Sequence, residues 1–82
     1  MEIKVLLFGP QAELAETTKL MVEIKNSPAN VRAVMDAIAL ASPPLKPTLA
    51  SSRLAINHGY ASDADAIVPS DEVALIGMVS GG

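Results

Sequence analysis

The chain has 82 residues and a net charge of −3; half of the residues are apolar, only Phe8 and Tyr60 are aromatic, and there is no cysteine. This length suits one small domain, and the lack of cysteine excludes disulfides, thiolate metal sites and a catalytic thiol. The basic residues are scattered, which argues against nucleic-acid binding. Since neither a signal peptide nor a run of ~20 apolar residues is visible, we expect a cytoplasmic protein without membrane contact.

The first half of the sequence opens with two predicted strands. Residues 3–8 (IKVLLF) form a short apolar run that ends at a Gly-Pro pair, which is typical of a strand followed by a turn. Residues 11–16 contain good helix formers but are too few for more than about one helical turn. Residues 19–24 (KLMVEI) are again short and apolar, and we expect them to form a strand antiparallel to the first.

The main predicted helix covers residues 30–41. Val31, Val34 and Ile38 recur there at helical spacing, and Asn30 is placed to cap the first turn. A Ser-Pro-Pro sequence then ends the helix, because proline disfavours helical geometry in the residue before it. A single amphipathic helix covers one face of a small sheet and leaves the other face open to solvent or a partner.

The second half predicts the remaining strands. Residues 45–52 are a linking segment with room for another helical turn, and residues 53–57 (RLAIN) form a third strand. His58-Gly59 is the predicted turn, after which residues 60–61 resume pairing. Residues 72–76 (EVALI) form the last strand.

The order of these elements predicts one α+β domain over residues 1–76. Its mixed sheet has four to five strands and is covered on one face by the main helix. Residues 77–82 (GMVSGG) contain three glycines, and we expect them to form a flexible tail.

Three segments carry a more specific pattern: IKVLLF at residues 3–8, AINH at 55–58, and DEVALI at 71–76 followed by the terminal VSGG. Together they resemble the ubiquitin-like sulfur carriers, the family of the molybdopterin synthase small subunit and the thiamine sulfur carrier. The resemblance extends over nearly the whole chain and implies the β-grasp fold. One departure is Gly77-Met78, which stands where the family usually has Pro-Pro and is expected to loosen the base of the tail.

The resemblance makes the carboxyl group of Gly82 the working group. It implies that an activating adenylyltransferase/sulfurtransferase uses ATP to adenylate Gly82 and converts it to a thiocarboxylate. The sulfur then goes to a pterin precursor in the large subunit of molybdopterin synthase. The chain would be a non-catalytic subunit that binds no cofactor itself. Gly81 and Gly82 suit this role physically, because residues without Cβ can thread a narrow channel and leave the reacting carbon uncrowded.

An apolar patch is expected on the open face of the sheet, where charged neighbours mark the wetter side. Its members are Leu6, Phe8, Ile76 and Tyr60. Any one of them alone could simply complete the core, but as a group they match family positions that dock the two partners. The resemblance adds three tail residues to the partner-binding set: Met78, Val79 and Ser80.

The other polar residues predict no metal site or catalytic constellation. His58 is the only histidine, with no second histidine or cysteine nearby. Asp63, Asp65, Asp71 and Glu72 lack the glycine and terminal glutamate of a calcium loop and are expected to form a solvated acidic edge.

Three alternatives to the molybdopterin interpretation remain open. The chain could be a carrier for the thiamine or another sulfur pathway, with the same terminal chemistry. It could be a protein modifier whose Gly82 is joined to a lysine amine. It could also be a plain interaction domain that uses its sheet face.

Overall fold

The computed structural model describes residues 1–25, 28–62 and 64–77. Its elements in chain order are β1 (Glu2–Leu6), α1 (Gly9–Ala15), β2 (Lys19–Glu23), α2 (Val31–Ala41), the 3₁₀ helix η1 (Pro43–Ser51), β3 (Ser52–Ile56), β4 (Gly59–Tyr60) and β5 (Val73–Gly77). The strands form one sheet in the order β2-β1-β5-β3-β4. The central strands β1 and β5 are parallel and the other neighbours are antiparallel. The predicted α+β class and mixed sheet are thereby confirmed.

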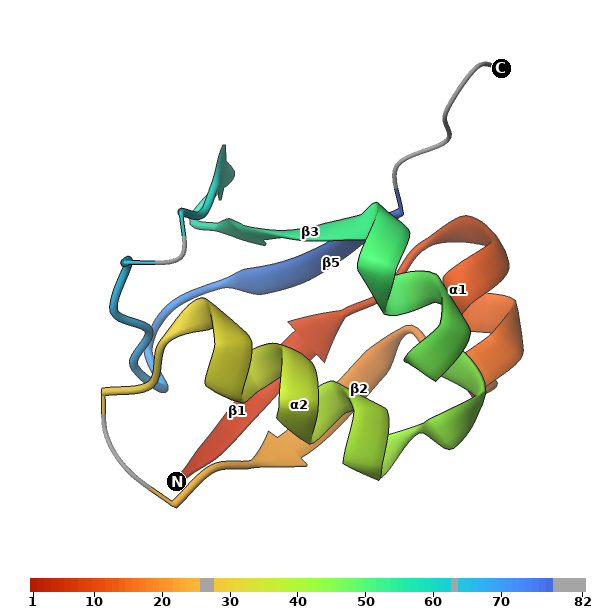
Figure 1. Ribbon diagram of the computed structural model, residues 1–82, viewed down its shortest axis with the longest axis horizontal. Coiled ribbons are helices and arrows are strands. Elements are labelled where there is room, and N and C mark those ends of the chain that lie inside the picture. The colour runs from red at the N-terminus through yellow and green to blue at the C-terminus, as the bar shows by residue number, and fades with distance from the viewer. Residues whose placement is uncertain (26–27, 63, 78–82) are drawn as a thin grey trace.

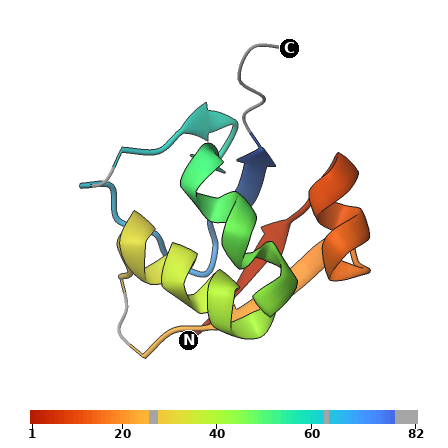
Figure 2. The same ribbon diagram turned by 45° about the vertical axis from the view of Figure 1, so that its right-hand side comes forward.

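The helices α2 and η1 pack on the same face of the sheet (Figures 1 and 2). Asn30 caps α2 as predicted: its side-chain oxygen accepts the Ala33 N–H at 2.8 Å. The helix ends at Ala41, directly before Ser42 and the two prolines that open η1. None of the helices in the described ranges is long and apolar enough to cross a membrane.

The core lies between the sheet and these two helices. The largest side chains that are fully enclosed there come from every layer: Ile3, Val5, Leu7, Val22, Val34, Ile38, Leu45, Leu54, Ile67, Val73 and Leu75. Side chains along residues 3–8 therefore alternate as predicted, with Ile3, Val5 and Leu7 pointing into the core. Leu6 and Phe8 are left to the opposite face.

Two helical segments are longer than the sequence predicts. The stretch expected to give about one turn is the seven-residue helix α1, which begins at Gly9. Pro10 fits its first turn, because the N–H that proline lacks has no partner there. The linking segment is the nine-residue 3₁₀ helix η1. Its prolines at 43, 44 and 47 disfavour an α-helix but allow the shorter 3₁₀ turns.

Boundaries in the second half also differ, and β3 begins and ends one residue earlier than predicted. The turn after β3 is Asn57-His58 and not His58-Gly59, since Ile56 pairs with Gly59 across it. The last strand begins and ends one residue later than predicted, so that Gly77 belongs to β5 and pairs with Ser52. Residues 60 and 61 do continue the pairing: Tyr60 faces Ala55, and Ala61 N–H donates to the carbonyl of Leu54 at 2.8 Å.

Candidate functional site

A row of side chains crosses the open face of the sheet from β1 to β4. The strand registers place Leu6 beside Ala74, Ala74 beside Ala55, and Ala55 beside Tyr60. Because side chains alternate along a strand, these residues project away from α2 and η1. The two alanines are small, so the middle of the row lies low between larger neighbours.

This row forms the floor of a shallow groove of about 390 Å³, which we call the open-face groove. It is lined by Leu6, Phe8, Ala55, His58, Tyr60, Glu72, Ala74 and Ile76. The four apolar residues predicted for a partner patch, Leu6, Phe8, Tyr60 and Ile76, are thus brought together. Phe8 and Tyr60 are 55% and 56% exposed, which is uncommon for the only two aromatic side chains of a small domain.

Tyr60 is held in place by its neighbour on β3. The guanidinium carbon of Arg53 lies 4.7 Å from the centroid of the Tyr60 ring, within the range of a cation–π contact. This contact steadies an exposed aromatic ring at the rim of the groove. Aromatic and arginine side chains in such positions are the usual anchors of protein interfaces.

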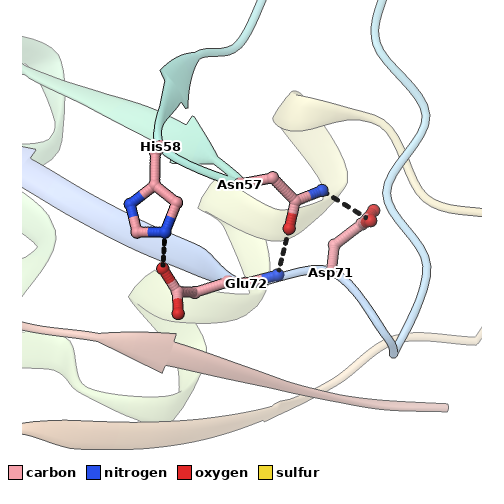
Figure 3. A network of polar contacts seen from close by, with 4 residues as sticks. All are labelled: Asn57, His58, Asp71 and Glu72. Atoms are coloured by element: carbon pink, nitrogen blue, oxygen red, sulfur yellow. Dashed lines mark hydrogen bonds and ion pairs between the residues drawn. The ribbon is translucent and has the colours of Figure 1, made fainter.

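A network of polar contacts, shown in Figure 3, includes two residues that line the open-face groove, His58 and Glu72. His58 Nε2 lies 3.1 Å from Glu72 Oε2, and both side chains are largely exposed. Asn57 joins the two loops that meet there. Its side chain donates to Asp71 Oδ1 at 3.1 Å and accepts the Glu72 N–H at 2.9 Å, while its backbone N–H donates to the Glu72 carbonyl at 2.8 Å.

Asp71 makes two hydrogen bonds with Val68 within the loop before β5. Its Oδ2 accepts the Val68 N–H at 2.9 Å, and its backbone N–H donates to the Val68 carbonyl at 3.0 Å. The hydrogen bond from Val68, and then the one from Asn57, hold the pKa of the Asp71 carboxyl below its usual value. Asp71 thus organises the loop and is not simply part of a solvated acidic edge. Asp63, predicted for the same edge, lies outside the described residues.

A second groove lies at the end of β5, around Gly77. Gln11 of α1 is buried there, with 6% of its surface exposed. Its Nε2 donates to Thr48 Oγ1 at 3.0 Å and to Ser52 Oγ at 2.8 Å. Phe8 and Ile76 line this groove as well as the open-face groove, so the two are neighbours.

The sequence does not predict the hydrogen bonds of Gln11 with Thr48 and Ser52. Gln11 comes from α1, Thr48 from η1 and Ser52 from β3, and no periodic pattern links such distant positions. Asn57 was also missed, although an Asn directly before a predicted turn is a recognisable signal for the left-handed conformation.

The predicted tail residues Met78, Val79, Ser80, Gly81 and Gly82 lie outside the described residues, and the domain boundary at residue 76 stays a prediction. In the part of the chain that the structure describes, no three His, Cys, Asp or Glu side chains lie together as a metal ion would need.

Comparison with known proteins assigns the chain to a family. The model of the ThiS family matches residues 5–82, which include both grooves and the terminal Gly-Gly. The chain belongs to the ThiS family. The predicted relationship to the sulfur carriers is therefore confirmed at the level of the family.

Relatives and solved structures agree with membership of the ThiS family. The molybdopterin synthase sulfur carrier subunit of Arabidopsis thaliana is 33% identical over 81 residues, which are 99% of this chain and 83% of that protein. The crystal structure of SAMP1, a small archaeal modifier protein from Haloferax volcanii, has a TM-score of 0.84 at 27% identity, with 100% of both chains covered. A chain of the Helicobacter pylori complex of subunits 1 and 2 of molybdopterin-converting factor has a TM-score of 0.66 at 20% identity, again with 100% of both chains covered. The β-grasp fold is confirmed.

Proposed function

We propose that this chain is the sulfur-carrier subunit of a molybdopterin synthase. The observation that carries the proposal is the identity of 33% along nearly the full chain to a plant protein of that name. The ThiS family model matches as far as residue 82, which supports a functional role for the terminal Gly-Gly. The chain would act as a substrate-like subunit, and its larger partners would supply the catalysis.

The chemistry proposed for Gly82 has three steps. The carboxylate oxygen attacks the α-phosphorus of ATP in an activating adenylyltransferase/sulfurtransferase, and pyrophosphate leaves. A sulfur nucleophile delivered by that enzyme then displaces AMP, which departs with the carboxylate oxygen and leaves a thiocarboxylate. In the large subunit of the synthase, the thiocarboxylate sulfur attacks a carbon of the pterin precursor and displaces an oxygen leaving group from it. Water then hydrolyses the acyl–sulfur bond and restores the carboxylate. This chain binds no cofactor in these steps, and ATP belongs to the activating partner.

The open-face groove is the proposed docking surface for both partners. It places Phe8 and Ile76 beside the strand end from which the Gly-Gly sequence follows. Five residues follow Gly77, and a fully extended chain of that length spans at most ~17 Å. A partner that binds this face must therefore hold its reaction site within that distance of Gly77. Met78, Val79 and Ser80 would contact the partner along this path.

The Helicobacter pylori structure supports a large subunit as one partner, because subunit 1 of that factor is bound there to subunit 2. The protein-modifier alternative is supported by the TM-score of 0.84 with an archaeal modifier protein. Both functions use an activated glycine carboxylate and differ in the acceptor. Carriers of the thiamine or another sulfur pathway differ only in the final sulfur acceptor.

Intact mass spectrometry tests the proposal. The chain is incubated with the activating enzyme, ATP and a sulfur donor, with deletion of Gly82 as the control. We expect a mass gain equal to the exchange of one oxygen for sulfur, located at Gly82 and absent from the control. Transfer of that sulfur to a pterin precursor when the large subunit is added would identify the pathway. If the mass stays unchanged although the same enzyme preparation activates another carrier, the proposal is contradicted. An isopeptide bond between Gly82 and a lysine amine would favour the protein-modifier alternative.

A further inference from the structure

Gln11 is a buried amide whose hydrogen bonds link three elements of the fold. A buried amide is costly unless its polar atoms find partners, and both donors of Gln11 are used, on Thr48 and Ser52. Those two hydroxyls donate onward, Thr48 to the carbonyl of Leu45 at 2.6 Å and Ser52 to the carbonyl of Thr48 at 2.7 Å. The amide plane of Gln11 is therefore fixed between α1, η1 and β3.

Gly77 lies directly against this fixed amide. A Cβ atom built on Gly77 would lie 3.2 Å from Gln11 Oε1 and 3.4 Å from its Cδ. Such contacts are tight, and the two hydrogen bonds of the amide oppose the small shift that would relieve them. Gly77 is also the cross-strand partner of Ser52, to which Gln11 donates. The last residue of β5 is thus packed between its partner strand and the Gln11 side chain.

We propose that Gln11 is a positioning residue for the carboxyl terminus. Gly77 is paired with Ser52 of β3, and the Gln11 side chain beside it limits how far Gly77 can shift from that position. A fixed starting point narrows the volume that a short chain end explores, which raises its effective concentration at a reaction site. This inference rests on the proposed function, because the reaction that it serves is the activation of Gly82.

Gln11 is only 6% exposed, so it offers little surface to a docked partner. Its loss is therefore expected to lower the rate of the reaction at Gly82 but not the affinity for the activating enzyme. Gln11→Met keeps the length and volume of the side chain and removes both donors. Glu13→Met, at an exposed position of the same helix, is the matched control.

The first experiment measures thiocarboxylate formation with the activating enzyme, ATP and a sulfur donor over a range of carrier concentrations. We expect Gln11→Met to lower kcat about tenfold with KM for the carrier unchanged, and Glu13→Met to change neither. A rise in KM at unchanged kcat, or no effect at all, would overturn the inference. If the wild-type chain itself gains no sulfur, the proposed function fails and the inference with it; if the wild type is converted and Gln11→Met matches it, only the inference fails.

The second experiment uses this chain alone, so it stays informative if Gln11→Met folds too poorly to be assayed with the activating enzyme. Thermal unfolding is measured for Gly77→Ala, for Gln11→Ala and for the double substitution. Because a methyl group at position 77 meets the Gln11 amide, Gly77→Ala is expected to lower the melting temperature of the wild type but to have little effect when Gln11→Ala has opened the space. Strictly additive shifts would show that Gln11 does not constrain Gly77.

Discussion

Asn57 and Asp71 are joined across the end of the sheet by a hydrogen bond of 3.1 Å between the Asn57 amide and Asp71 Oδ1. The Val68 N–H donates to the other oxygen of the same carboxylate at 2.9 Å. These donors favour the charged form, which is why the pKa of Asp71 is lowered in the folded chain. The ionised carboxylate therefore favours the folded state.

The first prediction concerns pH. A carboxyl whose pKa is depressed by folding contributes stability that is complete above its unfolded pKa of ~3.9 and is lost as the pH falls through the folded value. We expect Asp71→Asn to be less stable than the wild type at about pH 6, with a difference that shrinks towards about pH 3. Urea unfolding at both pH values measures this, with Asp36→Asn as an exposed control. An equal loss of stability at both pH values would show that the charge of Asp71 is unimportant.

The second prediction concerns the turn between β3 and β4. Asn57 and His58 have φ values of 50° and 73°, in the left-handed region that disfavours most residues other than Gly and Asn. Asn-Gly is the preferred pair for such two-residue hairpin turns. We expect His58→Gly to raise the free energy of unfolding by about 0.5–1 kcal/mol.

The control for this turn is His58→Ala. It also loses the exposed contact with Glu72, which contributes little by itself, but it keeps the left-handed strain. His58→Ala is therefore expected to gain nothing in chemical denaturation. Equal stabilities of the Gly and Ala variants would mean that backbone strain at position 58 is negligible.

The sequence predicted those features that depend on local pattern. Alternation along residues 3–8 put Leu6 and Phe8 on the open face, and helical spacing with a capping Asn30 located α2. The group around Gln11 could not be predicted in this way. Its hydrogen bonds join residues 37 and 41 positions apart, and only the packing of α1 and η1 against β3 brings them together.

The third prediction concerns the cap of α2. Asn30 satisfies the Ala33 N–H, which otherwise lacks a partner in the first turn of the helix. We expect Asn30→Ala to lower the free energy of unfolding by about 1 kcal/mol, and Asn30→Asp to retain most of the stability. Equilibrium urea unfolding measures both variants. An alanine variant as stable as the aspartate variant would contradict a role for the cap.

The fourth prediction separates binding from stability on the open face. Phe8 is 55% exposed beside Ile76, so its removal leaves the core nearly intact. If Phe8 anchors the large synthase subunit, Phe8→Ala is expected to weaken the complex by ~2 kcal/mol, about thirtyfold in Kd. The melting temperature of the free chain is expected to change little.

Leu40 provides the matched control for Phe8. It is an apolar side chain of α2 and is 84% exposed. The helix α2 lies on the side of the sheet opposite the open-face groove (Figure 1). Isothermal titration of the large subunit with Leu40→Ala is expected to give the wild-type affinity, because this side of the chain lies away from the open-face groove. An equal loss of affinity for Phe8→Ala and Leu40→Ala would indicate non-specific apolar attraction to the large subunit. A loss of affinity only for Leu40→Ala would move the docking surface to the helical face, and the exposure of Phe8 on the open face would then need another explanation.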